Sequence, residues 1–564
     1  MGKIEGGRLV VEACKKEGVT HLFSLCGNSI NPIYDACLDA GIKIIDTRHE
    51  SAAVYMADIW SRVTGEPGVS AVTSGPGHTN SLTGIATAWK AHSRVIAISG
   101  HYEIVHDEMG AMQEMDQIAF TKPITKWSKL ITDPTRIPNY MRIAFRQVMS
   151  GIPGPVHLSF AQDALLKKVD PAVLEEPEPR QFRAESLPAG NPVDVLRTAK
   201  MLLSARKPAA LVGGGVLWSK AGPALKAFVE AYGVPIFSMG LGRGVLPDDH
   251  PLSFGYANAR INGAARAFWE ADVVLVIGQR LNFRVNYGMQ PAFNPEARFI
   301  EVDLCAEEIG RNRPIEIGIV GDARTVLEQL TEAAGSTPPT PREDWVGKIR
   351  LYQQDQFDKW KPWLESSTRP IHPLRLCEEV RKQVDHDTTV VLDGGDIMQW
   401  GRGTIPAYGP AQVIDPGPMA VIGMGIASAI AAKLARPEGK VILFSGDGSF
   451  GFHTMEFSTA VRHGIPFVAV IANDCAWGMI KNDQLGLYGD GRVVGTELGL
   501  IRYDKVVQDL GGYGELVQEP DDIAPALQRA FASGLPACVN VVTQFTQSPI
   551  TEALRDQRKK FAEQ

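Results

Sequence analysis

The chain has 564 residues, a formal net charge of −7, 44% hydrophobic residues and 21% charged residues. This length is typical of about three domains, because a single core rarely serves much more than ~250 residues. A slightly acidic chain lacks the basic surface that nucleic-acid binding needs. No apolar run is long enough to span a bilayer, and the seven cysteines form no Cys-x-x-Cys pair. We expect a cytoplasmic protein with no nucleic-acid or membrane partner.

Short β-branched runs alternate with helical stretches along the chain, which favours parallel α/β sheets. The expected strands of the first third are Thr20–Leu25, Ile42–Asp46, Val69–Thr73, Val95–Ser99 and Val156–Phe160. Those of the middle third are Ala209–Val212, Val273–Ile277 and Phe299–Val302. Those of the last third are Thr389–Leu392, Val441–Phe444, Phe467–Ile471 and Val539–Val542.

Two Pro-rich stretches, Asp170–Asn191 and Gly335–Arg342, interrupt this alternation and lack apolar periodicity. Such composition is typical of linkers. We therefore expect three α/β domains, each with a mainly parallel sheet flanked by helices, at residues 1–165, 190–335 and 370–548. The charged tail, 549–564, is expected to form a solvated helix or, alternatively, a lid.

The sharpest pattern lies in the last third. Asp447 stands in a Gly-Asp-Gly-Ser stretch after one apolar run, and Asp474 follows the next apolar run. Neighbouring parallel strands end at the same edge of a sheet, where such folds bind ligands. Two carboxylates, the Ala476 carbonyl and a diphosphate would form the oxygen shell that Mg²⁺ prefers. Gly446 and Gly448 would let the backbone approach the diphosphate. Alone, the stretch also fits an ordinary turn; the second strand-end Asp favours a metal site.

With Asn473 before Asp474, this pattern resembles the signature of thiamine-diphosphate (ThDP) enzymes, and the resemblance extends over the full chain. The family has a Glu in an Arg-His-Glu-like context, which corresponds to Glu50 here. The resemblance places Glu50 against N1′ of the aminopyrimidine, where its carboxyl activates the cofactor. The alternative is a carboxylate stabilised by a helix N-terminus. In the family the active sites lie between subunits, which implies a homodimer or homotetramer.

Further positions match the family. The stretch 74–78 (SGPGH) matches its Gly-Pro-Gly loop, although such a stretch is also an ordinary strand-to-helix turn. Gln113 matches a glutamine on the substrate side, and Ile422 matches the residue that bends ThDP into a V shape. Glu497 is expected to be a second acid/base, with a surface carboxylate as the alternative. The resemblance implies cofactor contacts from Glu50, Gly75, Pro76, Gly395, Asp396, Ile422, Met424, Gly446, Asp447, Gly448, Ser449, Asp474, Ala476, Trp477 and Gly478.

The substrate is less clearly marked. The first domain resembles benzaldehyde lyase around residues 6–11 and 44–50, but it has Cys-Gly-Asn-Ser at 26–29 where that enzyme has histidines. The middle domain resembles 2-hydroxyacyl-CoA lyases and oxalyl-CoA decarboxylases in the stretches 240–251, 278–282 and 299–309. In those families this domain holds the ADP part of coenzyme A. The candidate CoA residues are Lys220, Arg280, Asp303 and Asp322.

We therefore expect a ThDP- and Mg²⁺-dependent 2-hydroxyacyl-CoA lyase that forms formyl-CoA and an aldehyde or ketone, with Glu50, Gln113 and Glu497 as catalytic residues. The alternatives are a CoA-independent carboligase or lyase, similar to acetolactate synthase or benzaldehyde lyase, and an oxalyl-CoA decarboxylase. A non-catalytic binding subunit is an alternative of another class. For the central domain three alternatives stay open: it holds CoA or ADP, it holds FAD as in acetolactate synthases, or it holds no ligand.

Overall fold

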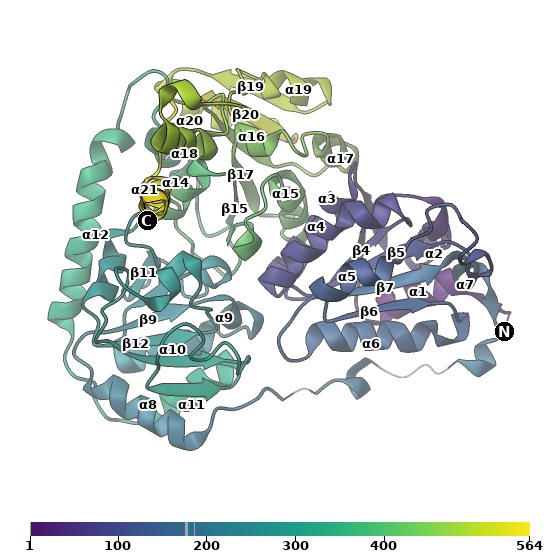
Figure 1. Ribbon diagram of the computed structural model, residues 1–564, viewed down its shortest axis with the longest axis horizontal. Coiled ribbons are helices and arrows are strands. Elements are labelled where there is room, and N and C mark those ends of the chain that lie inside the picture. Colours follow the sequence, from purple (N-terminus) through teal and green to yellow (C-terminus); the bar gives the residue numbers. More distant parts are fainter. Residues whose placement is uncertain (1, 175–178, 185, 564) are drawn as a thin grey trace. The chain divides into compact units, whose positions relative to one another are not determined.

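The computed structural model describes residues 2–174, 179–184 and 186–563. The chain folds into two compact units. The first consists of Met1–Glu185, Pro416–Glu438 and His453–Pro466, and the second of Ser186–Asp415, Gly439–Phe452 and Phe467–Gln564. Three six-stranded parallel sheets form the fold, one in the first unit and two in the second (Figure 1).

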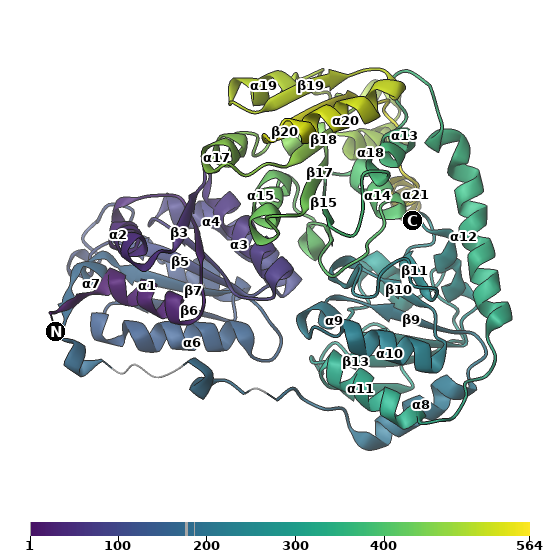
Figure 2. The same cartoon turned by 180° about the vertical axis from the view of Figure 1, so that it is seen from behind.

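The sheet of the first unit has the order β3 (Lys43–Asp46), β2 (His21–Ser24), β4 (Gly68–Val72), β5 (Val95–His101), β7 (Val156–Ala161) and β6 (Trp127–Ile131). One face is covered by α1 (Gly6–Lys16), α2 (Asn31–Ala40) and α6 (Ile137–Met149), whose apolar side chains form one core with the strands. The other face carries α3 (Glu50–Thr64) and α4 (Pro76–Ala91), and α15 (Gly425–Ala435) packs against α3 (Figure 2).

The central sheet has the order β11 (Ser253–Tyr256), β10 (Ile236–Ser238), β9 (Pro208–Val212), β12 (Val273–Ile277), β13 (Arg298–Asp303) and β14 (Ile317–Val320). Helices α8 (Pro192–Ser204), α10 (Gly222–Tyr232) and α11 (Ala323–Ala334) pack on one face, around Phe228 and Leu327. A second core, rich in phenylalanine, fills the other face. The strand order changes direction between β9 and β12.

The third sheet has the order β16 (Val413–Ile414), β15 (Thr388–Asp393), β17 (Lys440–Gly446), β18 (Val468–Asn473), β20 (Ala537–Val542) and β19 (Tyr513–Val517). One face packs on α13 (Pro373–Arg381), α14 (Asp396–Thr404) and α20 (Ile523–Ala532). Helix α18 (Gly478–Tyr488) follows β18 and contacts the C-terminal helix α21 (Pro549–Glu563). The strand order changes direction between β15 and β17.

The expected fold class is confirmed, and every expected strand is present within a residue or two at each end. The sequence did not reveal β6, β10, β11, β14, β16 and β19, or the long helix α12 (Glu343–Leu364). The tail is helical, as expected. The first linker lies partly outside the described residues, and the exact domain boundaries stay predictions.

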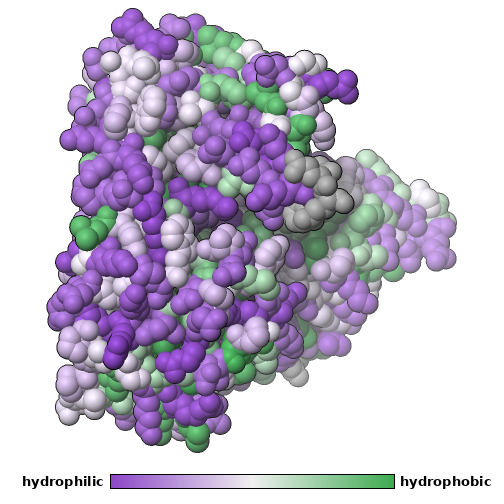
Figure 3. Space-filling model, turned by 60° about the vertical axis from the view of Figure 1, so that its left-hand side comes forward, coloured by the Kyte–Doolittle hydropathy of each residue, from purple (hydrophilic) through white to green (hydrophobic). Residues whose placement is uncertain are grey.

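The surface view is mainly hydrophilic, with small separate apolar patches on the face that Figure 3 shows. Among the helices of the described residues, none combines the length and the apolar character that crossing a membrane requires.

Candidate active site

Glu50 is the first residue of α3 and is buried, with 8% of its surface exposed. Its Oε2 accepts a hydrogen bond of 3.0 Å from Asn80 Nδ2 on α4. The helix N-terminus is capped one residue earlier, where His49 Nδ1 accepts from the Ser51 amide at 3.2 Å. Gly77 lets the start of α4 lie close to the end of β4, because a Cβ there would meet Thr73 Cγ2 at 2.8 Å. The carboxylate is therefore held at a fixed place, as an acid–base group must be.

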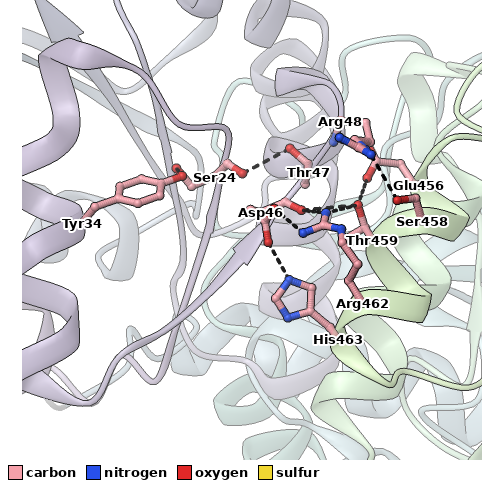
Figure 4. A network of polar contacts seen from close by, with 10 residues as sticks. All are labelled: Ser24, Tyr34, Asp46, Thr47, Arg48, Glu456, Ser458, Thr459, Arg462 and His463. Atoms are coloured by element: carbon pink, nitrogen blue, oxygen red, sulfur yellow. Dashed lines mark hydrogen bonds and ion pairs between the residues drawn. The ribbon is translucent and has the colours of Figure 1, made fainter.

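The turn between β3 and α3, which precedes Glu50, is held by α17 (Glu456–His463), as Figure 4 shows. The buried Glu456 accepts from the backbone amides of Arg48 (2.8 Å) and His49 (3.1 Å). Asp46 pairs with Arg462 and His463 of the same helix. Burial acts to raise the pKa of Asp46, but its bonds to His463 and Arg462 outweigh that effect and lower it. Charges therefore fix both sides of the turn that leads into α3.

The Gly-Pro-Gly loop lies at the carboxyl end of β4. Gly75 has φ 56° and ψ −112°, a left-handed conformation that favours glycine. A Cβ at Gly75 would meet Gln113 Cβ at 2.6 Å. Ser74 Oγ donates to Gln113 Oε1 at 2.6 Å, and Gln113 itself has φ 64°. The structure thus brings Gln113 against the loop 74–77, and the exposed Pro76 begins α4. That Gln113 faces the substrate stays a prediction.

In the second unit, Asp447 and Asp474 end neighbouring strands and interact directly. Asp447 is 2% exposed, and its Oδ2 has no hydrogen-bond partner among the described residues. Burial raises the pKa of both carboxyls, and their mutual repulsion adds to this for Asp447. Gly478 makes room for the pair, since a Cβ there would lie 2.6 Å from Asp474 Oδ2. Two buried acids with an orphaned oxygen are the arrangement that a divalent cation stabilises.

This donor set fits Mg²⁺ better than a transition metal, because it offers only oxygen. Within the described residues, no group of three or more His, Cys, Asp and Glu side chains could hold a metal. Backbone carbonyls and a bound diphosphate would have to complete the shell. The Ala476 backbone is available for this, next to Cys475, which has φ 60°.

Glycines follow the carboxyl ends of the paired strands β15 and β17. Gly394 has φ 111°, and a Cβ there would lie 3.1 Å from the Gly446 amide nitrogen and 3.4 Å from Ser449 Oγ. A Cβ at Gly395 would likewise lie close to Met479 Cβ. At Gly448, a Cβ would meet the Trp477 ring at 2.5 Å, so the indole covers the Gly-Asp-Gly turn. Glycine at these positions leaves backbone groups at the strand ends without a covering Cβ, as a diphosphate site would require.

Asp396 has partners that the sequence did not reveal. Its Oδ1 accepts from the Ser548 amide at 3.0 Å and from Thr551 Oγ1 at 2.5 Å, and Oδ2 accepts from Asn482 Nδ2 at 3.3 Å. Asp396 therefore ties the start of α21 to the loop after β15. The C-terminal helix is packed on α18, where a Cβ at Gly486 would clash with Arg555.

Glu497 lies beside the backbone of Ala476, with which it forms an isolated antiparallel bridge. Its carboxylate pairs with Lys481 at 2.7 Å, and the Trp477 amide donates to the Thr496 carbonyl at 2.8 Å. The segment is thus attached to the loop that follows Asp474. The Glu497 side chain is 65% exposed, which is the setting that the surface-carboxylate alternative predicts, and its role as an acid/base stays a prediction.

The central sheet has a switch point at the carboxyl ends of β9 and β12, the place at which such folds form a nucleotide-binding crevice. Gly215 and Gly278 approach so closely that a Cβ on either would meet the other. Arg280 follows, and burial lowers its pKa while the charges of Glu308 and Asp303 act to raise it. Asp303 ends β13 and accepts from the Cys305 amide at 2.8 Å.

The other two CoA candidates have different settings. Asp322 caps α11 by accepting from the amides of Arg324 (2.9 Å) and Thr325 (3.3 Å), which accounts for its burial without a ligand. Lys220 is exposed in the turn before α10 and has φ 53°. In the first unit, Ile422 is half-buried and Met424 is buried at the start of α15.

Models of the thiamine pyrophosphate enzymes match all three sheets: the N-terminal TPP binding domain over residues 4–120, the central domain over 195–330 and the C-terminal TPP binding domain over 393–541. The chain therefore belongs to the thiamine-diphosphate-dependent enzyme family, and thiamine diphosphate is its cofactor.

Individual relatives cover nearly the full length. The chain is 36% identical over 544 residues to the acetolactate synthase large subunit of Mycobacterium tuberculosis, with 96% of each chain covered. It is 31% identical over 581 residues to 2-hydroxyacyl-CoA lyase 2 of Homo sapiens, covering 95% of this chain and 90% of that protein. It is 30% identical over 555 residues to the 2-hydroxyacyl-CoA lyase of Arabidopsis thaliana, with 96% and 95% covered. Within the family, the chain is thus acetolactate-synthase-like and also similar to the 2-hydroxyacyl-CoA lyases.

Two supporting residues were missed. Asn80 holds the Glu50 carboxylate, and Glu456 holds the backbone before it. Asn80 could have been found from the helical spacing, because Gly77, Asn80 and Gly84 share the face of α4 that packs on α3. Glu456 carries no local signal, since its partners are some 400 positions away in the sequence.

Proposed function

We propose that the protein is a Mg²⁺- and ThDP-dependent 2-hydroxyacyl-CoA lyase that cleaves the C1–C2 bond of a 2-hydroxyacyl-CoA into formyl-CoA and an aldehyde or ketone, and also runs in reverse. The observation that carries this proposal is the switch point of the central sheet, where the half-buried Arg280 follows two closely packed glycine turns. The relatives named 2-hydroxyacyl-CoA lyase, from human and plant, support the same substrate class.

Bound ThDP would supply a nucleophilic carbon and an electron sink. Asp447, Asp474 and the Ala476 carbonyl would hold Mg²⁺, and the glycines at 394, 395, 446 and 448 would leave room for the diphosphate. Glu50 would hold and move the proton at the pyrimidine N1′. Ile422 and Met424 would support the ring system from the start of α15.

Substrate handling falls to other residues. Gln113, fixed by Ser74, would orient the substrate carbonyl, and Glu497 would exchange a proton with the departing carbonyl product. Arg280 would bind phosphate of the CoA moiety, and Asp303 would accept from its ribose or adenine. We propose that these sites are completed between the subunits of a homodimer or homotetramer.

Acetolactate synthesis is the second candidate, because the mycobacterial relative with that name is 36% identical over almost the full chain. It would need no CoA site, and the central crevice would then hold FAD or no ligand. Absorbance offers a simple distinction, since bound FAD colours the protein yellow.

The deciding experiment offers the enzyme, with ThDP and Mg²⁺, 2-hydroxyisobutyryl-CoA, lactoyl-CoA and mandelyl-CoA beside pyruvate and benzoin. Formyl-CoA formed together with the matching aldehyde or ketone is the expected result. Turnover of pyruvate or benzoin, with no turnover of any thioester, would refute the CoA assignment and leave a CoA-independent carboligase or lyase.

A further inference from the structure

A buried glutamine, which the sequence did not single out, joins the substrate-side loop to the centre of its sheet. Gln117 begins α5 (Gln117–Thr121) and is 2% exposed. Its Oε1 accepts from the Gly75 amide at 3.1 Å. Its Nε2 donates to the Gly100 carbonyl at 2.9 Å and to Ser159 Oγ at 2.8 Å. The side chain therefore bridges β5, β7 and the loop after β4.

The two backbone partners fix which way the amide points. The Gly75 amide can only donate and the Gly100 carbonyl can only accept, so the oxygen must face Gly75 and the nitrogen must face Gly100. A carboxylate would set oxygen against the Gly100 carbonyl, and an apolar side chain would leave two buried backbone groups unpaired. Since an unpaired buried group costs free energy, the position requires a primary amide.

The surroundings of Gln117 are polar but uncharged. Ser99 Oγ contacts Gln117 Nε2 at 3.4 Å and His157 Nε2 at 2.7 Å. Burial lowers the pKa of His157 well below its usual value and that of the adjacent His78 to about 4. The neutral imidazole of His157 and the hydroxyls complete the network, so its bonds depend on geometry and not on ion pairing.

The loop that Gln117 holds is the one that positions Gln113. The Gly75 backbone is in a left-handed conformation, and Gln113 packs directly against it. The preceding residue, Ser74, donates to Gln113 Oε1. Releasing the Gly75 amide would let the loop move, and Gln113 would move with it.

We propose that Gln117 is a positioning residue for the reaction: by holding the Gly75 amide, it fixes the Ser74–Gln113 pair that orients the substrate carbonyl. This assignment rests on the proposed role of Gln113 in a ThDP enzyme. Gln117 touches neither substrate nor cofactor in this scheme and acts only through Gly75.

The test compares Gln117→Met, which has a similar shape but no amide, with Thr121→Val as a matched control. Thr121 belongs to the same buried network, where its Oγ1 contacts His157 Nδ1 at 2.9 Å, but it has no bond to Gly75. The first readout is hydrogen exchange of the peptide that covers residues 72–80, in full-length protein. We expect the Gly75 amide to exchange at least ~10-fold faster in Gln117→Met and to be unchanged in Thr121→Val.

The second readout is steady-state kinetics with 2-hydroxyisobutyryl-CoA and pyruvate. We expect Gln117→Met to lower kcat roughly 10- to 100-fold while KM changes less than about 3-fold, because orientation is lost but binding groups remain. Thr121→Val should stay within about 2-fold. Unchanged Gly75 exchange, or equal kinetic losses in both variants, would overturn the assignment. If wild type turns over no substrate, the proposed function fails, but the exchange experiment still decides whether Gln117 holds Gly75.

Discussion

The sheet of the first unit and the C-terminal sheet have the same topology, but different polar groups lie at their switch points. In each, the strands lie in the order second, first, third, fourth, sixth and fifth along the chain, so each has a switch point between its first and third strands. The C-terminal switch point has Asp447, with the carboxylate of Asp474 from the next strand beside it. The switch point of the first unit has hydroxyls: Ser29 Oγ lies 2.9 Å from Thr73 Oγ1 and accepts from the Ser74 amide at 3.2 Å.

We propose that this difference lets one topology serve the two ends of the cofactor. A diphosphate with its cation would need carboxylates and uncovered backbone groups, and these follow β15, β17 and β18. A neutral aminopyrimidine and a substrate carbonyl need hydrogen-bonding groups and one movable proton, which the first unit offers in Gln113 and Glu50. The central sheet, with the order third, second, first, fourth, fifth and sixth, follows a different plan.

The largest effect on activity is expected from a change at Glu50 in the first unit. Glu50→Gln keeps the shape and the bond from Asn80 but cannot exchange a proton, so we expect kcat to fall at least ~1,000-fold, the upper range for loss of an acid–base group. Melting temperature and Mg²⁺ affinity should remain those of wild type. Activity close to wild type would contradict the role of Glu50 in cofactor activation.

The matching change in the other sheet is Asp447→Asn. It removes one charge from the acidic pair, so we expect the apparent Mg²⁺ affinity to fall roughly 10- to 100-fold, as loss of a charge-assisted ligand implies. Excess Mg²⁺ should recover part of the activity, which it cannot do for Glu50→Gln. Titration of ThDP-dependent activity against Mg²⁺, with EDTA-treated protein as the starting point, measures both variants. If Asp447→Asn and wild type depend on Mg²⁺ concentration equally, Asp447 does not bind the metal.

The central sheet offers a smaller effect. Arg280→Ala should raise KM for a CoA thioester about 10-fold, because one phosphate contact is lost in ground state and transition state alike, with little change in kcat. Pyruvate or benzoin turnover should not respond. If KM for every thioester stays the same, the crevice between β9 and β12 does not bind CoA through Arg280.

Most of this architecture could be predicted from the sequence, for physical reasons that particular strands illustrate. β9, β12 and β17 are buried on both faces and consist of nearly continuous apolar runs. Most of the missed strands, including β6, β14 and β19, lie at sheet edges, where exposure weakens the pattern. The helix α12 was missed because few of its residues are buried and Pro362 lies near its end.

Some residues of the candidate site could likewise be found from the sequence, and others could not. Asp447, Asp474 and the glycine turns follow strands directly, so local order and spacing were enough to find them. Glu456, Asn80 and Gln117 act on residues of other segments, and their partners are defined only once the chain is folded. Asp396 is an intermediate case: its place after β15 was expected, but its bonds to the C-terminal segment were not.

The smallest expected effect concerns Glu456, which holds the backbone that leads to Glu50. Burial raises the pKa of Glu456 to about 6, although Thr459 and the amides of Arg48 and His49 act to lower it. A carboxyl whose pKa is raised by folding stabilises the fold while protonated, and that contribution is lost as pH rises from about 4.5 through about 6. Glu456→Gln accepts from the same amides but does not ionise. The free energy of unfolding of wild type should therefore fall relative to Glu456→Gln by on the order of 2 kcal/mol across that interval. Denaturant titrations at pH 4.5 and pH 7.5 measure this difference, and a constant offset between the two proteins would mean that Glu456 does not titrate in the folded state.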